Sequence, residues 1–195
     1  MNNNNLERYR FRIFYSKKGT LRFTSTLDMQ KVWERTLRRA NQKLRYSKGF
    51  HPQPRIQQAS PLPLGFQSHA EIVDIWLENC VPNFVLQISD LQEFCPIGLS
   101  INQIQKINIK DNPLQNSVFA SNYQITFINS IDKNYLENAV DQLNQREIIQ
   151  RTKRGKKYNL RPLINTIYMK DLGNAKFCLF LQLKTMPGAT GRPDE

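Results

Sequence analysis

The sequence predicts an α+β protein: a ferredoxin-like split βαβ domain, with an antiparallel sheet and both helices on one face, followed by a second, incomplete ferredoxin-like unit. Two observations predict this fold class. Apolar residues alternate or recur at helical spacing in the order β-α-β-β-α-β up to residue 105, and after a polar stretch the order begins again as β-α-β-β. Hydrophobic residues make up 39% of the chain, which is enough for a core.

The first strand and the first helix have the clearest patterns. From Tyr9 to Tyr15, apolar residues alternate with arginines, which predicts a strand with an aromatic core face and an arginine face. We expect Arg10 and Arg12, with Arg8, on the open face of the sheet or at its edge. The hydroxyl residues at 24–26 can cap a helix from Leu27 to about Gln42, with one apolar stripe and one basic side.

Shorter patterns predict the other elements of the first unit. Pro82 favours the first turn of a second helix that carries Phe84, Ile88 and Leu91, and the sequence Pro96-Ile97-Gly98 ends it. Strands are predicted at residues 55–60, 70–77 and 99–104.

The domain organisation follows from these elements. Residues 1–7 carry four consecutive asparagines and are predicted to be disordered, the ferredoxin-like domain covers 8–105, and the polar residues 106–118 form a linker. The second unit covers 119–195. It is expected to contain a strand at 123–127, a helix that Asp132 caps and that carries Tyr135, Leu136, Ala139 and Leu143, a hairpin that turns at Gly155, and a strand at 176–184. Arg192-Pro193 resembles the start of a helix, so this unit either continues further or lacks its last helix and strand.

The charge distribution indicates the class of partner. The formal net charge is +12, and two windows, 8–55 and 146–170, hold 22 of the 28 Lys and Arg residues. This excess favours nucleic acid, another polyanion or an anionic membrane surface as partner. Clustered cations are the footprint of a nucleic-acid binder, and a solvated Lys/Arg surface is the alternative. Apolar runs are far shorter than the roughly 20 residues of a membrane span, and the N-terminus lacks a signal core, so we expect a cytoplasmic protein that does not contact membranes.

The three cysteines indicate neither a disulfide framework nor a zinc site. Cys80, Cys95 and Cys178 are too few and too scattered for a disulfide scaffold or a zinc ribbon. Cys178 lies in an apolar run and is expected to be buried, and a reducing compartment argues against a Cys80–Cys95 pair.

The segment from Arg45 to Gly65 is central to the functional interpretation. It holds four of the ten prolines, which exclude a helix and stiffen the chain. It also presents cations and two rings, which would contact phosphates and stack on bases, or else pin the segment to the sheet. With the basic hairpin, whose charges could instead protect a sheet edge, the candidate nucleic-acid-binding residues are Arg10, Arg12, Arg22, Arg38, Arg45, Tyr46, Lys48, Phe50, Arg55, Arg151, Lys153, Arg154, Lys156, Lys157 and Arg161.

Several motifs resemble a known family. They are Leu21-Arg22-Phe23 with Leu27-Asp28, then Tyr46-Ser47-x-Gly49-Phe50-x-Pro52-x-Pro54-Arg55, and Pro61-Leu62-Pro63-Leu64-Gly65. They are similar to the radical SAM-linked proteins, a bacterial domain of unknown function found beside or fused to B12-binding radical SAM proteins. Asn159–Leu163 and Arg192-Pro193 fit later motifs, so the resemblance covers most of the chain. One departure is Thr26, where the family pattern has histidine, so a role assigned to that histidine does not transfer.

The resemblance implies an accessory to RNA modification or processing. Three scattered cysteines cannot supply the C-x₃-C-x₂-C motif of a radical SAM cluster, so no cofactor is expected in this chain. The radical SAM partner would carry the iron–sulfur cluster, S-adenosylmethionine and B12. The expected partners are therefore RNA and a radical SAM protein, and neither a metal nor a small-molecule substrate is expected.

We expect a non-catalytic RNA-binding accessory domain, with two alternatives. One is a protein-docking module for a radical SAM enzyme without RNA contact. The other is a metal-independent endoribonuclease that uses His51, Tyr46 and Lys48 as acid, base and charge stabiliser. Because His51 and His69 lack catalytic partners at a recognisable spacing, we expect both to be ordinary loop residues.

Overall fold

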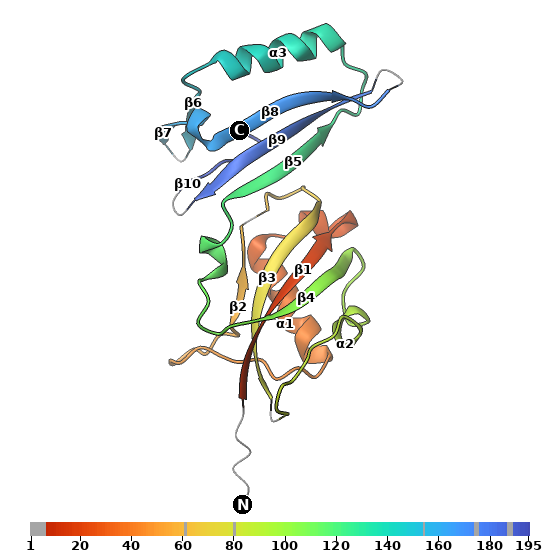
Figure 1. The fold of residues 1–195 in the computed structure, drawn as a ribbon, viewed down its shortest axis with the longest axis vertical. Coiled ribbons are helices and arrows are strands. Elements are labelled where there is room, and N and C mark those ends of the chain that lie inside the picture. Colours follow the sequence, from red (N-terminus) through yellow and green to blue (C-terminus); the bar gives the residue numbers. More distant parts are fainter. Residues whose placement is uncertain (1–6, 61, 80, 154, 174–175, 187–188) are drawn as a thin grey trace, which may run out of the picture. The chain divides into compact units, whose positions relative to one another are not determined.

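The computed structural model describes residues 7–60, 62–79, 81–153, 155–173, 176–186 and 189–195. The predicted disorder of the first residues therefore falls largely outside the described part, as does Cys80. The chain divides into two compact units, residues 1–117 and 118–195. The fold class agrees with the sequence prediction: a ferredoxin-like α+β unit is followed by a unit with part of the same plan (Figure 1).

The first unit has a four-stranded sheet in the order β2-β3-β1-β4. All neighbouring strands are antiparallel, which is the arrangement of the split βαβ plan. Its elements are β1 (Glu7–Lys17), η1 (Gly19–Phe23), α1 (Thr26–Arg39), β2 (Ile56–Gln58), β3 (Ser68–Asn79), α2 (Ser89–Gln92), β4 (Leu99–Ile107) and η2 (Leu114–Asn116).

The core of this unit lies between the sheet and α1. Alternating residues of β1, from Tyr9 to Tyr15, are buried on the helix side, as their spacing predicts. Helix α1 begins at the predicted hydroxyl cap, where the Ser25 hydroxyl accepts a hydrogen bond from the Asp28 amide (3.1 Å). Trp33 of α1 is fully buried, with its ring edge-on to Tyr15 at 5.0 Å between centroids. The apolar stripe of α1 therefore closes one face of the sheet.

The predicted second helix is wrong in extent. Only Ser89–Gln92 is helical, and Asn83 has a φ of 55°, which breaks the chain direction after Pro82. Phe84 instead packs edge-on against Tyr9 and Phe11, and its amide donates to the Tyr9 hydroxyl (3.3 Å). Tertiary packing therefore replaces the first turns of the expected helix.

The predicted linker is also wrong in character. Lys106 and Ile107 belong to β4, and the following residues turn back across the sheet face that the helices leave open. Leu114 is fully buried there, and its amide donates to the Gln57 side-chain oxygen (3.3 Å). This segment is therefore a packed part of the first unit.

The second unit has the β-α-β-β part of the plan, with a hairpin added. Strand β9 pairs antiparallel with β5, β8 and β10, and β6 pairs with β7. Its elements are β5 (Ala120–Thr126), α3 (Lys133–Gln145), β6 (Gln150–Lys153), β7 (Lys156–Asn159), η3 (Arg161–Leu163), β8 (Ile164–Asp171), β9 (Phe177–Met186) and β10 (Ala189–Thr190).

Local predictions for the second unit hold in part. Asp132 caps α3 by accepting from the Tyr135 amide (2.7 Å), and Gly155, with a φ of 78°, lies in the hairpin turn. The buried side of α3 is formed by Leu136 and Val140, whereas Tyr135 and Ala139 are exposed. Residues 192–195 form a turn rather than a helix. Among the helices that the structure describes, none is long and apolar enough to cross a bilayer.

Candidate nucleic-acid interface

The segment after α1 forms a loop that leaves the sheet and returns to it. Tyr46 and Pro54 form a β-bridge, and the Ser47 amide donates to the Gln53 carbonyl (2.8 Å). Between them Lys48, Phe50 and His51 are exposed, and Phe50 is completely so (103%). The proline-rich segment therefore presents a cation and an aromatic ring to solvent, as the sequence predicts.

Both ends of this loop are fixed to β3. The Arg45 amide donates to the Trp76 carbonyl (2.9 Å), and the Trp76 amide donates to the Arg55 carbonyl (3.1 Å). The Arg55 amide donates to the Arg45 carbonyl (2.8 Å). The loop is thus held by strand-like bonds at its base, so the exposed tip projects from a rigid support.

The basic side of α1 continues into this loop. The Arg38 guanidinium donates to the Tyr46 hydroxyl (2.8 Å), which joins the last turns of the helix to the loop. The exposed cations from Arg35 to Lys48, with the two loop rings, form what we term the basic surface: Arg35, Arg38, Arg39, Lys43, Tyr46, Lys48 and Phe50.

Most of the charge on the basic surface is not neutralised. Within the part of the chain that the structure describes, only Arg38 of these cations forms an ion pair, with Glu34 at 2.7 Å. Arg39 donates to the Phe94 carbonyl (2.8 Å), which fixes the side chain without cancelling its charge. Exposed cations that are mostly unpaired, together with an exposed ring on the same loop, favour a polyanion as ligand.

The arginines of β1 have a different role from the predicted one. Arg10 is only 2% exposed, and it forms bonds to the buried Asp74 carboxylate (2.6 Å from Nη2) and to the carbonyls of Asp111 and Asn112. Arg12 also binds Asp74 (2.8 Å from Nε), which raises the pKa of the Arg12 guanidinium. The expectation that Arg10 contacts nucleic acid is therefore corrected: its donors are used inside the protein.

The other predicted residues of the first unit lie at the surface. Arg22 is exposed with its guanidinium over the Phe23 ring at 4.6 Å. Arg45 approaches Glu78 (3.9 Å), and Arg55 lies over Trp76 at 4.9 Å. These three arginines are placed by neighbours that leave part of each guanidinium open.

The predicted cations of the second unit are described by themselves. Arg151 and Lys157 are exposed on the β6–β7 hairpin, and Arg151 donates to the Glu195 carbonyl (2.6 Å). Arg161 is structural, because it donates to the carbonyls of Asn144, Arg146 and Ile164, so its predicted binding role is corrected. Arg154 and the side chains of Lys153 and Lys156 lie outside the described residues.

The proposed catalytic set is not assembled. Lys48 and His51 lie on the exposed tip, and the Tyr46 hydroxyl accepts a hydrogen bond from Arg38 rather than bonding to either of them. Among the described residues no three His, Cys, Asp or Glu side chains gather as metal ligands. Cys95 and Cys178 are free thiols, Cys178 is buried as predicted, and burial raises the pKa of Cys95 to about 11. The described geometry therefore gives the endoribonuclease alternative no acid–base pair.

Sequence reasoning missed Trp76. It alternates with the core residues Ile75 and Leu77 of β3 and therefore faces the opposite side of the sheet, next to Arg10 and Arg55. The alternation in Ala70–Leu77 was a sufficient signal, because an outward tryptophan among core residues is unusual for a merely solvated face.

Fold and surface together define a class of protein: a small α+β protein with a ferredoxin-like unit, part of a second one, and a cationic loop fixed to the first sheet. Residues 10–193 match the model of a family described as an uncharacterized protein conserved in bacteria (DUF2344). The chain belongs to this bacterial family of unknown function. No curated protein matches it.

Proposed function

We propose that this protein is a non-catalytic RNA-binding accessory domain that acts with a radical SAM partner in RNA modification or processing in the cytoplasm. The basic surface supports RNA binding, because it combines unpaired cations with a fully exposed phenylalanine on a loop that the sheet holds in place. Phosphates would lie along the cations of α1, and a base would stack on Phe50. The radical SAM partner rests on the sequence motifs described above, and any cofactor belongs to that partner.

The observation that carries RNA binding is the pairing of charge with an exposed ring. A solvated lysine and arginine surface needs no aromatic residue, whereas the fully exposed ring of Phe50, on a loop that the sheet holds in place, offers a stacking face beside the cations of that loop. Single-stranded nucleic acid uses both features, since its backbone is anionic and each base has a flat face.

The test is a binding titration with a fluorescein-labelled oligouridylate of about 12 nucleotides at several KCl concentrations. We expect affinity to fall steeply with salt. The triple variant Arg35→Gln, Arg39→Gln, Lys48→Gln should reduce the slope of log K against log salt by about 2, because each single-strand phosphate contact contributes about 0.7. Phe50→Ala should weaken binding about tenfold and leave the slope unchanged, because stacking is not electrostatic.

The matched control removes the same charge elsewhere. The control is the triple variant Lys110→Gln, Lys133→Gln, Lys176→Gln. All three lysines are exposed and lie outside the basic surface. This triple variant should leave the slope nearly unchanged. Two results would refute the proposal. One is an equal reduction of the salt slope in the two triple variants, and the other is absence of binding at about 50 mM KCl, where phosphate contacts are strong.

A protein-docking role has one observation in its favour. Phe23, Leu27 and Leu64 are each more than half exposed, and the Gly65 amide donates to the Arg22 carbonyl (2.7 Å), which brings two of the sequence motifs together. An exposed apolar group of this kind is typical of a protein contact. If a radical SAM protein co-purifies with the natural protein without RNA, and the Leu27→Asp variant no longer retains it, this second function is favoured over the first.

A further inference from the structure

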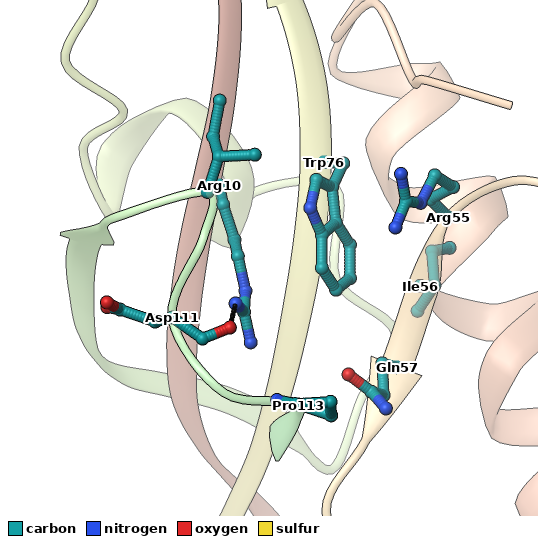
Figure 2. A pocket seen from close by; sticks show the side chains of 8 residues that line it. Arg10, Arg55, Ile56, Gln57, Trp76, Asp111 and Pro113 are labelled. Atoms are coloured by element: carbon teal, nitrogen blue, oxygen red, sulfur yellow. Dashed lines mark hydrogen bonds between the residues drawn. The ribbon is translucent and has the colours of Figure 1, made fainter.

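A hollow on the first sheet lies on the face opposite α1. Its volume is about 490 Å³, within the range of small-ligand sites. It lies between β1, β3 and β2 on one side and residues 109–113 on the other (Figure 2). Its lining includes Arg10, Arg55, Gln57, Trp76, Ile109 and Pro113.

The floor of the hollow is rigid. Figure 2 shows the indole of Trp76 between the side chains of Arg10 and Arg55, and each guanidinium carbon is 4.9 Å from a ring centroid of that indole. The Arg55 backbone is bonded on both sides, to Arg45 and to Trp76. Arg10 is fixed by Asp74. A ligand would therefore meet groups that are already in position, which reduces the entropy lost on binding.

The hollow carries one cation without a counter-charge. Asp74 pairs with Arg10 and is shared with Arg12, whereas Arg55 forms no ion pair within the described residues. Burial, and then the nearby charges of Arg45 and Arg10, lower the pKa of the Arg55 guanidinium. The Asp111 carboxylate accepts from the Asn108 amide (3.2 Å) and points away from Trp76, so it is not a counter-charge for Arg55.

The remaining wall is apolar. Ile109 and Pro113 line it, and the Ile109 side chain is 41% exposed. A small inorganic ion would leave this wall uncovered, and a neutral apolar molecule would leave Arg55 unpaired. The lining therefore fits a molecule with an anionic head and a flat or apolar body.

We propose that this hollow binds an organic phosphate of nucleotide size, with the phosphate on Arg55 and the body against Ile109 and Pro113. Arg55 provides a planar fork of donors for the phosphate, and Gln57 lies beside it. The site is distinct from the basic surface and does not depend on RNA binding there. The phosphate could belong to a free nucleotide or to one nucleotide of a strand.

The test uses the two tryptophans as reporters in the full chain. The ¹⁵N-labelled protein gives two indole N–H resonances, from Trp33 and Trp76, which Trp33→Phe assigns. Adenosine 5′-monophosphate should shift the Trp76 resonance with a dissociation constant of about 0.1–1 mM, the range expected for one charged contact and a partly covered body. The Trp33 resonance should not move, because Trp33 is fully buried on the other side of the sheet.

Variants and probes separate the contributions. Arg55→Gln should weaken adenosine 5′-monophosphate about tenfold, since a charge-assisted contact is lost, and the exposed Arg146→Gln should not change it. Ile109→Glu, which places negative charge at the rim and leaves the arginines intact, should weaken it as well. Inorganic phosphate and adenosine alone should each bind more weakly than the nucleotide.

Three results would overturn this inference. They are a Trp76 resonance unmoved at about 10 mM nucleotide, equal affinities of the Arg55→Gln and Arg146→Gln proteins, and inorganic phosphate binding as tightly as the nucleotide. A 5′-phosphorylated dinucleotide that binds more tightly than the mononucleotide would identify a strand as the source, and equal binding would identify a free nucleotide. Loss of oligouridylate binding in Phe50→Ala leaves this result untouched, so the two proposals fail separately.

Discussion

Asp74 shows how one carboxylate can fix an entire sheet face. It is fully buried on β3, and it accepts from two arginines of the neighbouring strand. Arg10 in turn holds the carbonyls of residues 111 and 112, so the segment that crosses the sheet depends on this pair. A buried ion pair contributes little compared with apolar packing, but the loss of one partner leaves a buried charge uncompensated.

We predict that Asp74→Asn lowers the free energy of unfolding by about 3–5 kcal/mol, the usual cost of an uncompensated buried charge. Urea unfolding followed by tryptophan fluorescence measures this loss, because Trp33 and Trp76 both lie in the first unit. The control is Glu34→Gln, which removes the exposed pair with Arg38 and should change stability little. Equal effects of the two substitutions would contradict the role given to Asp74.

Glu71 predicts a dependence of stability on pH. It lies half-buried on β3 opposite Tyr15, and burial raises the pKa of its carboxyl, an effect that Ser68 and Lys17 reduce. A raised folded-state pKa means that the folded state retains the proton to higher pH than the unfolded state. The contribution of Glu71 to stability is therefore largest below the unfolded pKa of about 4.3 and is lost as pH rises through the folded value.

The measurement is the difference in unfolding free energy between the natural protein and Glu71→Gln at about pH 4, below the unfolded pKa, and at about pH 7. The natural protein should lose stability relative to the variant as pH rises, because glutamine does not titrate. A difference that stays constant, or that moves in favour of the natural protein, would show that Lys17 compensates the buried carboxylate fully.

At the scale of the element, prediction from sequence succeeded where a pattern is local. The alternation of β1, the Ser25 and Asp132 caps and the turn at Gly155 depend on residues close together in the chain. The break at Pro96-Ile97-Gly98 is of the same kind. Gly98 has a φ of 93°, and a Cβ there would lie 2.4 Å from the Lys18 carbonyl oxygen, so only glycine fits between α2 and β4.

Prediction failed where distant segments decide the outcome. The residues after Pro82 pack on Tyr9 and Phe11 instead of forming a helix, and residues 108–117 cover the sheet instead of linking two units. Arg10 became structural for the same reason, since its partners at 111 and 112 lie about a hundred residues away. The exposed loop of the candidate site was predictable from its prolines, whereas the hollow at Trp76 requires three strands and the crossing segment together.

At the scale of the whole molecule, the two units have separate cores. Among the residues that the structure describes, seventeen buried ones from Tyr9 to Ile101 form one cluster and six from Ile149 to Leu183 form another. The basic surface and the hollow both lie within residues 1–117. The first unit alone therefore contains every group that the two proposals require.

We predict that residues 1–117 fold without the second unit. A complete four-stranded sheet with both helices and a closed core satisfies its own burial, and 117 residues are well above the size of about 60 at which single domains begin to fold alone. The fragment should unfold in urea in one cooperative transition with the fluorescence change of the full chain, because both tryptophans report this unit. The slope of its unfolding free energy against urea concentration should be close to the slope from the fluorescence transition of the full chain, since the same surface is exposed on unfolding. Residues 118–195 lack tryptophan, so their unfolding in the full chain is followed by circular dichroism. A fragment with solvent-exposed tryptophan emission and a gradual transition would show that the first unit requires the second for its stability.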